Sequence, residues 1–190
     1  MENDCIENKI FDKINYTQQP LPKGEYENCT FSNCDFSSSN LKDIKFTECT
    51  FVSCNLSLAK LSDTAFRDVK FKDCKLMGLH FESCNKFGLT FSFENCILDH
   101  SSFYQQKIKK TAFKNTRLQE VDFTETDLGS SIFDNCDLAD TKFNNTVLEK
   151  VDFSTSYNYS IDPEKNRISK AKFSMQGISG LLDKYDIEIE

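Results

Sequence analysis

The chain has 190 residues, a formal net charge of −7, nine cysteines, 18 phenylalanines and no tryptophan. This length suffices for one domain with a substantial core, and nothing in the sequence marks a second domain. The acidic balance argues against non-specific binding of nucleic acid or of anionic lipid, because both need basic surface.

The N-terminal residues 1–25 are predicted to form an irregular coil or cap. They keep part of the periodic pattern described below, but Pro20, Pro22 and Gly24 interrupt it. Residues 1–6 contain no basic segment followed by an apolar one, so we predict no secretory signal. No run of residues approaches the length of a membrane span. We therefore expect a cytoplasmic protein with no membrane contact.

Residues 26–155 carry Phe, Leu or Ile at almost every fifth position. Neither an α-helix nor an ordinary strand sustains an apolar period of five. A solenoid does, when each side of a polygonal coil takes five residues and points its middle residue at the axis. The sequence therefore predicts an all-β solenoid. Two registers carry it: Phe31, Phe36, Leu41, Phe46, Phe51, Leu56, Leu61, Phe66, Phe71, Leu76 and Phe81, and then Phe93, Leu98, Phe103, Ile108, Phe113, Leu118, Phe123, Leu128, Phe133, Leu138, Phe143, Leu148 and Phe153.

A register slip of two residues separates the two series, near residues 82–92. The first register would place Lys86 on the axis, which is costly for an unpaired charge. We therefore predict that residues 84–92 bulge and that Gly88 eases the bend. Such a bulge can mark a binding site, although a structural kink is the commoner explanation.

Eight of the nine cysteines stand at one position of the repeat, two residues before the position that points at the axis. Small residues such as Ala, Val and Thr share this position, so Cys acts there as a small hydrophobic side chain. The chain has no CxxC pair, which argues against a metal site. We predict buried, reduced thiols rather than disulfides or metal ligands. The eight are Cys29, Cys34, Cys49, Cys54, Cys74, Cys84, Cys96 and Cys136.

Residues 156–190 are assigned to a C-terminal loop, a short helix and a terminal strand. Ser174 can N-cap the helix, and residues 186–190 alternate as a final strand would. Four apolar residues of the helix, spaced i, i+3, i+4 and i+7, are the predicted contact of a homodimer, because they offer more apolar surface than capping the last coil needs. A helix that only caps its own coil is the alternative. The four are Ile178, Leu181, Leu182 and Tyr185.

The repeating unit reads A/C/T/V-polar-F/L-polar-polar, as in Cys34-Asp-Phe36 and Val121-Asp-Phe123. It resembles the pentapeptide repeat family, whose consensus is A(D/N)LXX. The resemblance implies a right-handed quadrilateral β-helix of twenty residues per coil.

Residues twenty apart should then stack in columns. We predict two Phe columns, a Cys column, an Asn column and a set of charge pairs. The columns are Phe31, Phe51, Phe71 and Phe91; Phe93, Phe113, Phe133, Phe153 and Phe173; Cys34, Cys54 and Cys74; and Asn95, Asn115 and Asn135. The charge pairs are Glu94 over Lys114, Lys107 over Asp127, Lys114 over Asp134, Arg117 over Asp137 and Asp122 over Lys142.

The residues offer no recognisable enzyme. The two histidines, His80 and His100, fall on opposite sides of the register slip, and no nucleophile elbow, phosphate-binding loop or HExxH spacing occurs. We therefore predict no catalytic residue, no cofactor and no metal. The expected function is a non-enzymatic interaction or scaffold module for an unknown protein partner.

An acidic stretch is the main candidate interaction surface. Residues 118–141 contain seven acids and no basic residue, and they follow a basic stretch, 102–117. The chain also resembles quinolone-resistance (Qnr-type) members of the family, which implies an alternative function. In that alternative the rod imitates duplex DNA, binds DNA gyrase or topoisomerase IV without contacting nucleic acid, and dimerises through its C-terminal helix. The seven acids are Glu120, Asp122, Glu125, Asp127, Asp134, Asp137 and Asp140.

Overall fold

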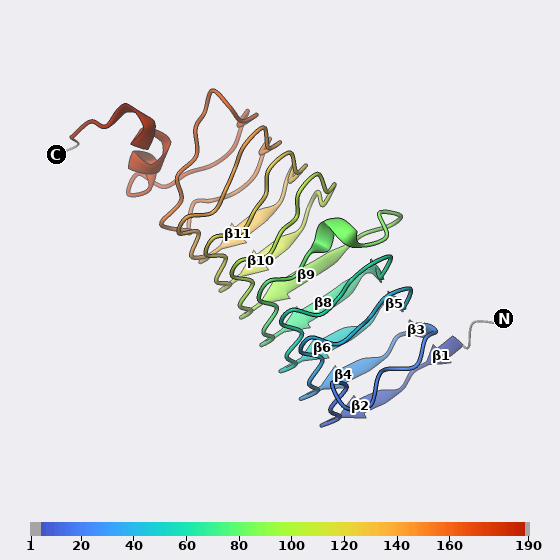
Figure 1. The fold of residues 1–190 in the computed structure, drawn as a ribbon. Helices are drawn as coiled ribbons and strands as arrows, with labels where there is room; N and C mark the ends of the chain where they lie inside the picture. Colours follow the sequence, from blue (N-terminus) through green and yellow to red (C-terminus); the bar gives the residue numbers. More distant parts are fainter. Residues whose placement is uncertain (1–4, 189–190) are drawn as a thin grey trace.

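The computed structural model describes residues 5–188, which form a rod of stacked coils (Figure 1). Each strand pairs in parallel with the segment one coil further on, and Phe31 lies opposite Phe51 in this pairing. Twenty residues therefore make one coil, as the five-residue period predicts for four sides. The expected β-solenoid is confirmed.

Two sides of the rod carry parallel sheets. The first has the order β1-β3-β5-β7 and ends before the bulge, and the second has the order β11-β10-β9-β8-β6-β4-β2. The other two sides pair through isolated bridges, and so does the first side beyond the bulge, as at Lys107 and Asp127. The first sheet contains β1 (Cys5–Glu7), β3 (Glu25–Glu27), β5 (Lys45–Thr47) and β7 (Ala65–Arg67). The second contains β2 (Ile10–Asp12), β4 (Thr30–Ser32), β6 (Thr50–Val52), β8 (Val69–Lys72), β9 (Phe91–Glu94), β10 (Ala112–Lys114) and β11 (Ile132–Asp134).

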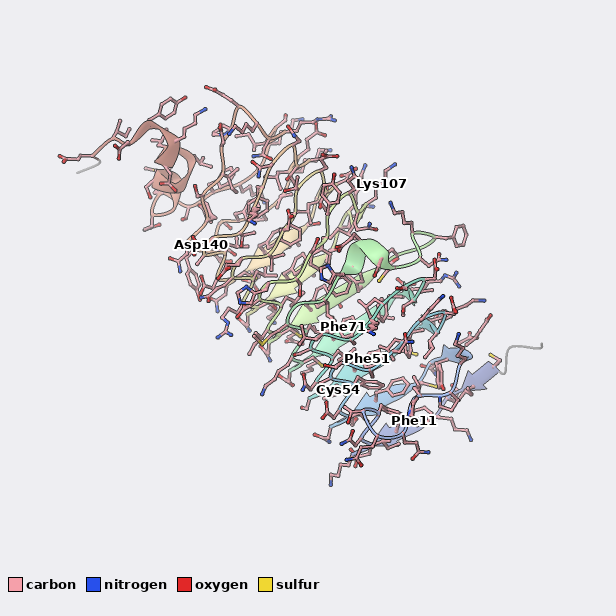
Figure 2. All side chains as sticks on the ribbon, viewed as in Figure 1. Phe11, Phe51, Cys54, Phe71, Lys107 and Asp140 are labelled. Atoms are coloured by element: carbon pink, nitrogen blue, oxygen red, sulfur yellow. The ribbon has the colours of Figure 1, made fainter. Side chains whose placement is uncertain are left out.

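The two predicted phenylalanine columns are one continuous column, which corrects the prediction; it runs beside a separate stack of Phe81, Phe103, Phe123 and Phe143. Phe93 lies against Phe71, with ring centroids 5.3 Å apart and planes 9° apart, because β8 pairs with β9 at an offset of 22 residues. Phe91, expected at the end of the first column, instead lies opposite Val69, and its ring is tilted by 56° and 54° against the rings of Phe81 and Phe93. Figure 2 shows the column at Phe11, Phe51 and Phe71. Its members are Phe11, Phe31, Phe51, Phe71, Phe93, Phe113, Phe133, Phe153 and Phe173.

The two extra residues are taken up by a bulge, as predicted. It starts with the 3₁₀ helix η1 (Phe81–Ser83) and continues as a loop through Thr90 that leaves the rod (Figure 1). Gly88 has a φ of +70°, in the left-handed region that glycine adopts without strain. Phe87 stands on this loop with 79% of its surface exposed.

The corners of the rod are built from left-handed residues. In almost every repeat the second residue after the buried one has a φ near +50° to +64°, as in Asn33, Ser53 and Asp73. Asn, Asp and Ser are frequent there, and Asn and Asp tolerate this conformation better than most residues.

The N-terminal segment continues the repeat. Strands β1 and β2 pair with β3 and β4 at the twenty-residue offset, so residues 5–24 form the first coil. The polar turns around Pro20 and Pro22 are irregular, as the sequence indicates. No helix within the described range 5–188 is long and apolar enough to cross a membrane.

The C-terminal segment differs from the predicted helix and strand. Two 3₁₀ helices, η2 (Ile178–Leu181) and η3 (Asp183–Tyr185), replace the single helix. The Oγ atom of Ser174 accepts a hydrogen bond from the Gly177 N–H (3.0 Å), close to the predicted capping role. Residues 186–188 are not in a strand, and residues 189–190 lie outside the described range.

Candidate interaction surfaces

The seven acids of the candidate acidic surface lie around the rod rather than on one side. They belong to successive sides of the coil that starts at residue 121, apart from Glu120 just before it. Side chains on consecutive sides point in different directions. In Figure 2, Asp140 lies on the opposite edge of the rod from Lys107. The structure therefore arranges these acids as a belt.

Three of the seven acids support the backbone. Each directs one carboxylate oxygen at the N–H two residues ahead: Asp122 to Thr124 (2.8 Å), Asp127 to Gly129 (3.1 Å) and Asp137 to Ala139 (3.3 Å). This is the Asx turn, which replaces a backbone hydrogen bond at a bend. Asn15, Asp35 and Asn55 make the same bond in earlier coils. The Asp or Asn of the repeat is therefore a structural residue.

Side chains of adjacent coils neutralise or bind several of these acids. Lys109 lies 3.1 Å from Asp127. Gln105 donates to Glu125 (2.8 Å), Gln119 donates to Asp137 (2.7 Å), and Thr155 donates to Asp134 (3.0 Å). The acids that neither form an Asx turn nor contact a lysine or arginine are Glu120, Glu125, Asp134 and Asp140.

The shortest ion pair of the basic stretch joins Arg117 to Asp99. Nη2 and Nε of Arg117 lie 2.5 and 2.7 Å from Oδ2 of Asp99, whose side chain is almost fully buried. This contact raises the pKa of Arg117 above its ordinary value. Arg117 and Asp99 are eighteen residues apart, so the Arg117 side chain contacts the preceding coil. The Arg117 backbone pairs with that of Asp137 in the following coil, but the predicted charge pair with Asp137 does not form.

The histidines contact different acids. Nδ1 of His80 lies 2.8 Å from Glu82, and Nδ1 of His100 lies 3.3 Å from Glu120. Both imidazoles are exposed. The structure therefore gives each histidine its own surface partner.

The bulge presents an aromatic side chain to solvent. Phe87 stands at the loop, and the Arg67 guanidinium lies 5.5 Å from its ring centroid while Arg67 Nε donates to the Phe87 carbonyl (3.4 Å). The Asn85 side chain accepts from the Phe87 N–H (3.0 Å). These contacts hold the loop while leaving the ring exposed.

The cysteines occupy the predicted positions in the core. Eight are buried and Cys5 is exposed, and all nine are free thiols. The Cys34 and Cys54 N–H groups each point at the sulfur of the next cysteine in the column (3.4 Å), which confirms the stacking of Cys34, Cys54 and Cys74. Burial raises the pKa of Cys136 to about 12. The Asn95, Asn115 and Asn135 ladder is also confirmed, with amide contacts of 3.1 and 2.9 Å.

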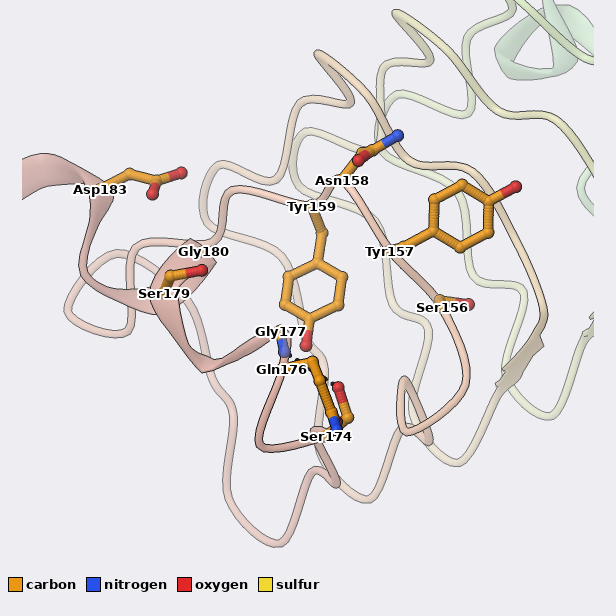
Figure 3. Close-up of a pocket in the computed structure, with 10 residues that line it drawn as sticks. All are labelled: Ser156, Tyr157, Asn158, Tyr159, Ser174, Gln176, Gly177, Ser179, Gly180 and Asp183. Carbon is orange, nitrogen blue, oxygen red and sulfur yellow. Dashed lines mark hydrogen bonds between the residues drawn. The ribbon is translucent and has the colours of Figure 1, made fainter. Parts of the chain in front are cut away.

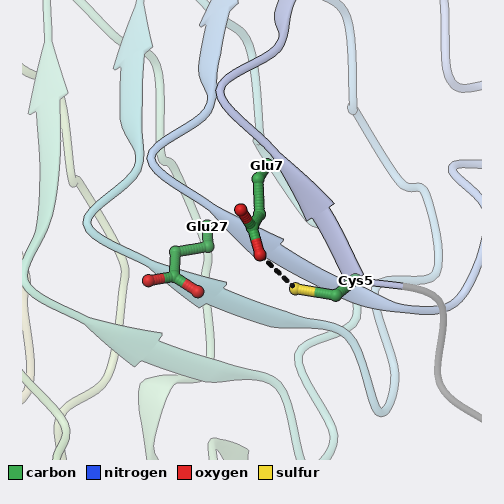
Figure 4. A group of neighbouring side chains, drawn as sticks. All are labelled: Cys5, Glu7 and Glu27. Atoms are coloured by element: carbon green, nitrogen blue, oxygen red, sulfur yellow. Dashed lines mark hydrogen bonds between the residues drawn. The ribbon is translucent and has the colours of Figure 1, made fainter.

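Within residues 5–188, one group of exposed side chains has ligand atoms close enough together for a metal ion. Cys5, Glu7 and Glu27 place their sulfur and carboxylate atoms within 4.8 Å of one another (Figure 4). Cys5 Sγ donates to a Glu7 carboxylate oxygen (3.5 Å). Mutually hydrogen-bonded, exposed acidic groups of this kind are common at protein surfaces without a metal.

The four predicted dimer-contact residues divide into two groups. Leu181 packs against the apolar core and Leu182 is half-buried, whereas Ile178 and Tyr185 are 43% and 53% exposed. The Tyr185 hydroxyl donates to Glu164 (3.0 Å). Part of the expected contact surface is therefore used within the chain.

Two glycines explain how the C-terminal segment packs on the last coil. A Cβ atom at Gly180 would lie 2.0 Å from the Tyr159 carbonyl oxygen, and one at Gly177 would lie 2.0 Å from the Tyr159 hydroxyl. Figure 3 shows the Tyr159 ring pointing toward Gly177 and Ser174, inside a cleft between the coil and the segment. Gly177 and Gly180 are thus required for this close approach.

Comparison with known proteins identifies the family. The family profile described as "Pentapeptide repeat region" matches residues 25–92 and 89–157. The chain therefore belongs to the pentapeptide repeat family. No curated protein sequence matches it.

Solved structures share the fold. Full-length QnrB1, a plasmid-mediated fluoroquinolone resistance protein, aligns with a TM-score of 0.63 at 16% identity, covering 97% of this chain and 100% of QnrB1. Trypsin-treated QnrB1 gives a TM-score of 0.62 at the same identity, with 95% and 98% coverage. HetL, a pentapeptide repeat protein involved in heterocyst differentiation regulation in the cyanobacterium Nostoc sp., aligns with a TM-score of only 0.35 at 12% identity, covering 88% of this chain and 86% of HetL. At these identities the likeness to QnrB1 concerns the fold alone.

Proposed function

We propose that this protein is a non-enzymatic interaction module that binds a protein partner through its outer surface. The observation that carries the proposal is the filled interior. Rings such as Phe51 and Phe113 stack along the axis with no exposed surface. Ligand sites need a concavity, and a solenoid with such a core offers the outer surface for recognition.

The loop that carries Phe87 is the proposed contact. Aromatic side chains and arginine are enriched among the residues that dominate binding energy at protein interfaces. Here a 79% exposed Phe stands on a loop that leaves the rod, beside the guanidinium of Arg67 from strand β7. The Asn85 side chain accepts a hydrogen bond from the Phe87 N–H, and Arg67 Nε donates one to the Phe87 carbonyl. Both bonds hold the loop, which limits the entropy lost on binding.

Site-specific photocrosslinking in cells tests this proposal. A benzoylphenylalanine in place of Phe87 should give a discrete crosslinked species. The same replacement of Leu58, which is 64% exposed on another repeat, is the matched control. Equal crosslinking from both positions, or none from position 87, would contradict the proposal.

A second candidate is a DNA mimic that binds DNA gyrase or topoisomerase IV. It is supported by the net charge of −7, the acidic belt and the rod shape shared with QnrB1. A gyrase supercoiling assay with and without fluoroquinolone tests it directly. Replacing Glu120, Glu125 and Asp140 together by Gln, Gln and Asn should abolish any effect on gyrase, because it removes three negative charges from the belt. The fold should remain intact, because these three acids do not form Asx turns. Unchanged activities of both gyrase and topoisomerase IV with the wild-type protein would exclude this candidate and leave the first intact.

A further inference from the structure

The two ends of the rod are finished in different ways. At the C-terminal end, Leu181 packs on the core, the Ile161 N–H donates to the Gly180 carbonyl (2.8 Å), and Lys184 lies 2.8 Å from both Asp162 and Glu164. The chain therefore covers its own last coil. The C-terminal segment therefore prevents another molecule from stacking directly on the last coil.

The N-terminal end of the described chain has no comparable cover. Strands β1 and β2 are the outermost strands of their sheets (Figure 1), and within residues 5–188 each pairs with one neighbour only. Edge strands present unpaired N–H and C=O groups that favour further pairing. Solenoids ordinarily need a cap at such an end.

An apolar groove lies at this end. It has a volume of about 520 Å³ and is lined mainly by Ile6, Ile10, Phe11, Ile14 and Leu21. The Phe11 ring stacks on Phe31 (4.8 Å) and, unlike the rings inside the column, has a stacking partner on one face only within the described chain. Ile10 is 77% exposed. Apolar surface of this kind gains free energy when it is removed from water.

The charge of the first coil permits self-association. Residues 5–24 carry three lysines and two acids, so this end is nearly neutral although the whole chain has a net charge of −7. Two copies that meet here bring little net charge together, so their mutual repulsion is small. In a two-fold arrangement, Lys9 and Lys13 of one copy can approach Glu7 and Asp12 of the other.

We propose that two copies of this chain bind each other through their N-terminal ends, about a two-fold axis, with Ile10 and Phe11 filling the groove of the partner copy. A two-fold contact uses the same surface twice and closes at a dimer. Because the C-terminal end is self-covered, head-to-tail stacking into a filament is blocked. The dimer through Ile178, Leu181, Leu182 and Tyr185 expected from the sequence is the competing arrangement.

Sedimentation equilibrium of the full chain from 5 to about 300 µM separates these arrangements, with far-UV circular dichroism as the check on folding. The wild-type protein should dimerise. Ile10→Glu should raise the dissociation constant by at least tenfold, and the matched variant Ile178→Glu at the other end should leave it unchanged.

Three results would overturn the proposal. The first is a wild-type monomer at every concentration. The second is a dimer that Ile178→Glu disrupts and Ile10→Glu does not, which would assign association to the C-terminal end. The third is a monomer that dimerises only when residues 2–4 are deleted, which would assign the groove to the chain's own first residues.

Discussion

Replacing Phe113 with Ala should lower the free energy of unfolding by about 3–5 kcal/mol. The side chain has no exposed surface, and its ring lies between Phe93 and Phe133 with centroid distances of 5.2 and 4.6 Å. Truncation loses roughly 1.5–3 kcal/mol of transfer free energy. The loss of two stacked contacts, at about 0.5–1.5 kcal/mol each, and the remaining cavity account for the rest.

The matched control is Phe87→Ala, which removes the same atoms from the surface. Phe87 is 79% exposed and contacts the Arg67 guanidinium at 5.5 Å, so its loss should cost less than about 1 kcal/mol. Urea titrations followed by far-UV circular dichroism and by tyrosine fluorescence measure both values, and coincident curves justify a two-state analysis. A difference below 1 kcal/mol between the two variants would refute the stacked column as the source of stability.

Three further predictions concern the ends of the rod and the thiols. Gly180→Ala should detach the C-terminal segment and increase trypsin cleavage there, because the new Cβ would overlap a backbone carbonyl at 2.0 Å, whereas Gly129→Ala should have little effect. Ellman's reagent at pH 8 should label Cys5 alone in the native protein, since the other eight thiols are buried, and fast labelling of several thiols would contradict this. The hydrogen bond from Lys184 lowers the pKa of Asp162 in the folded protein. This contact therefore stabilises the fold at pH values above the pKa that Asp162 has in the unfolded chain. The stabilisation is lost as the pH falls through the lower pKa that Asp162 has in the folded protein. Carboxyl NMR should place the Asp162 pKa below 3.8, and Lys184→Met should raise it.

The sequence predicts most of the fold because one repeat rule applies to every side of the rod. The same five-residue pattern that identifies Phe51 as a core residue identifies Cys54 as its small neighbour, and both are buried. The vertical ladders of Cys and Asn follow from the same rule. Local and tertiary signals agree at almost every position, which is what a uniquely specified structure requires.

The register slip marks the limit of that rule. Periodicity locates two extra residues but does not say whether they belong to the loop or to the coil that follows. Backbone pairing decides this, since Val69 lies opposite Phe91 and Phe71 opposite Phe93. The predicted pair of columns is wrong because it kept the offset of twenty across the insertion.

The charge pairs were also only partly predictable. Side chains were expected to pair with the residue directly above them, twenty positions away, and Glu94 does lie 3.6 Å from Lys114. Other pairs are eighteen apart, such as Arg117 with Asp99 and Arg167 with Glu149. A long side chain leans diagonally across the coil, and this direction depends on rotamers that a sequence period does not encode.

The repeat also restricts where partner specificity can be encoded. Two of its five positions fill the core, one often forms the Asx turn, and one adopts the left-handed corner, where Asn and Asp are tolerated best. Asp at the Asx position therefore contributes acidic charge to the surface for a structural reason, and Asn serves the same purpose at Asn55. A count of acids consequently overstates the evidence for a DNA mimic. The Phe87 loop departs from the repeat, and the apolar groove at the first coil is a surface that the repeat does not predict, so both carry more information about partners than the acids do.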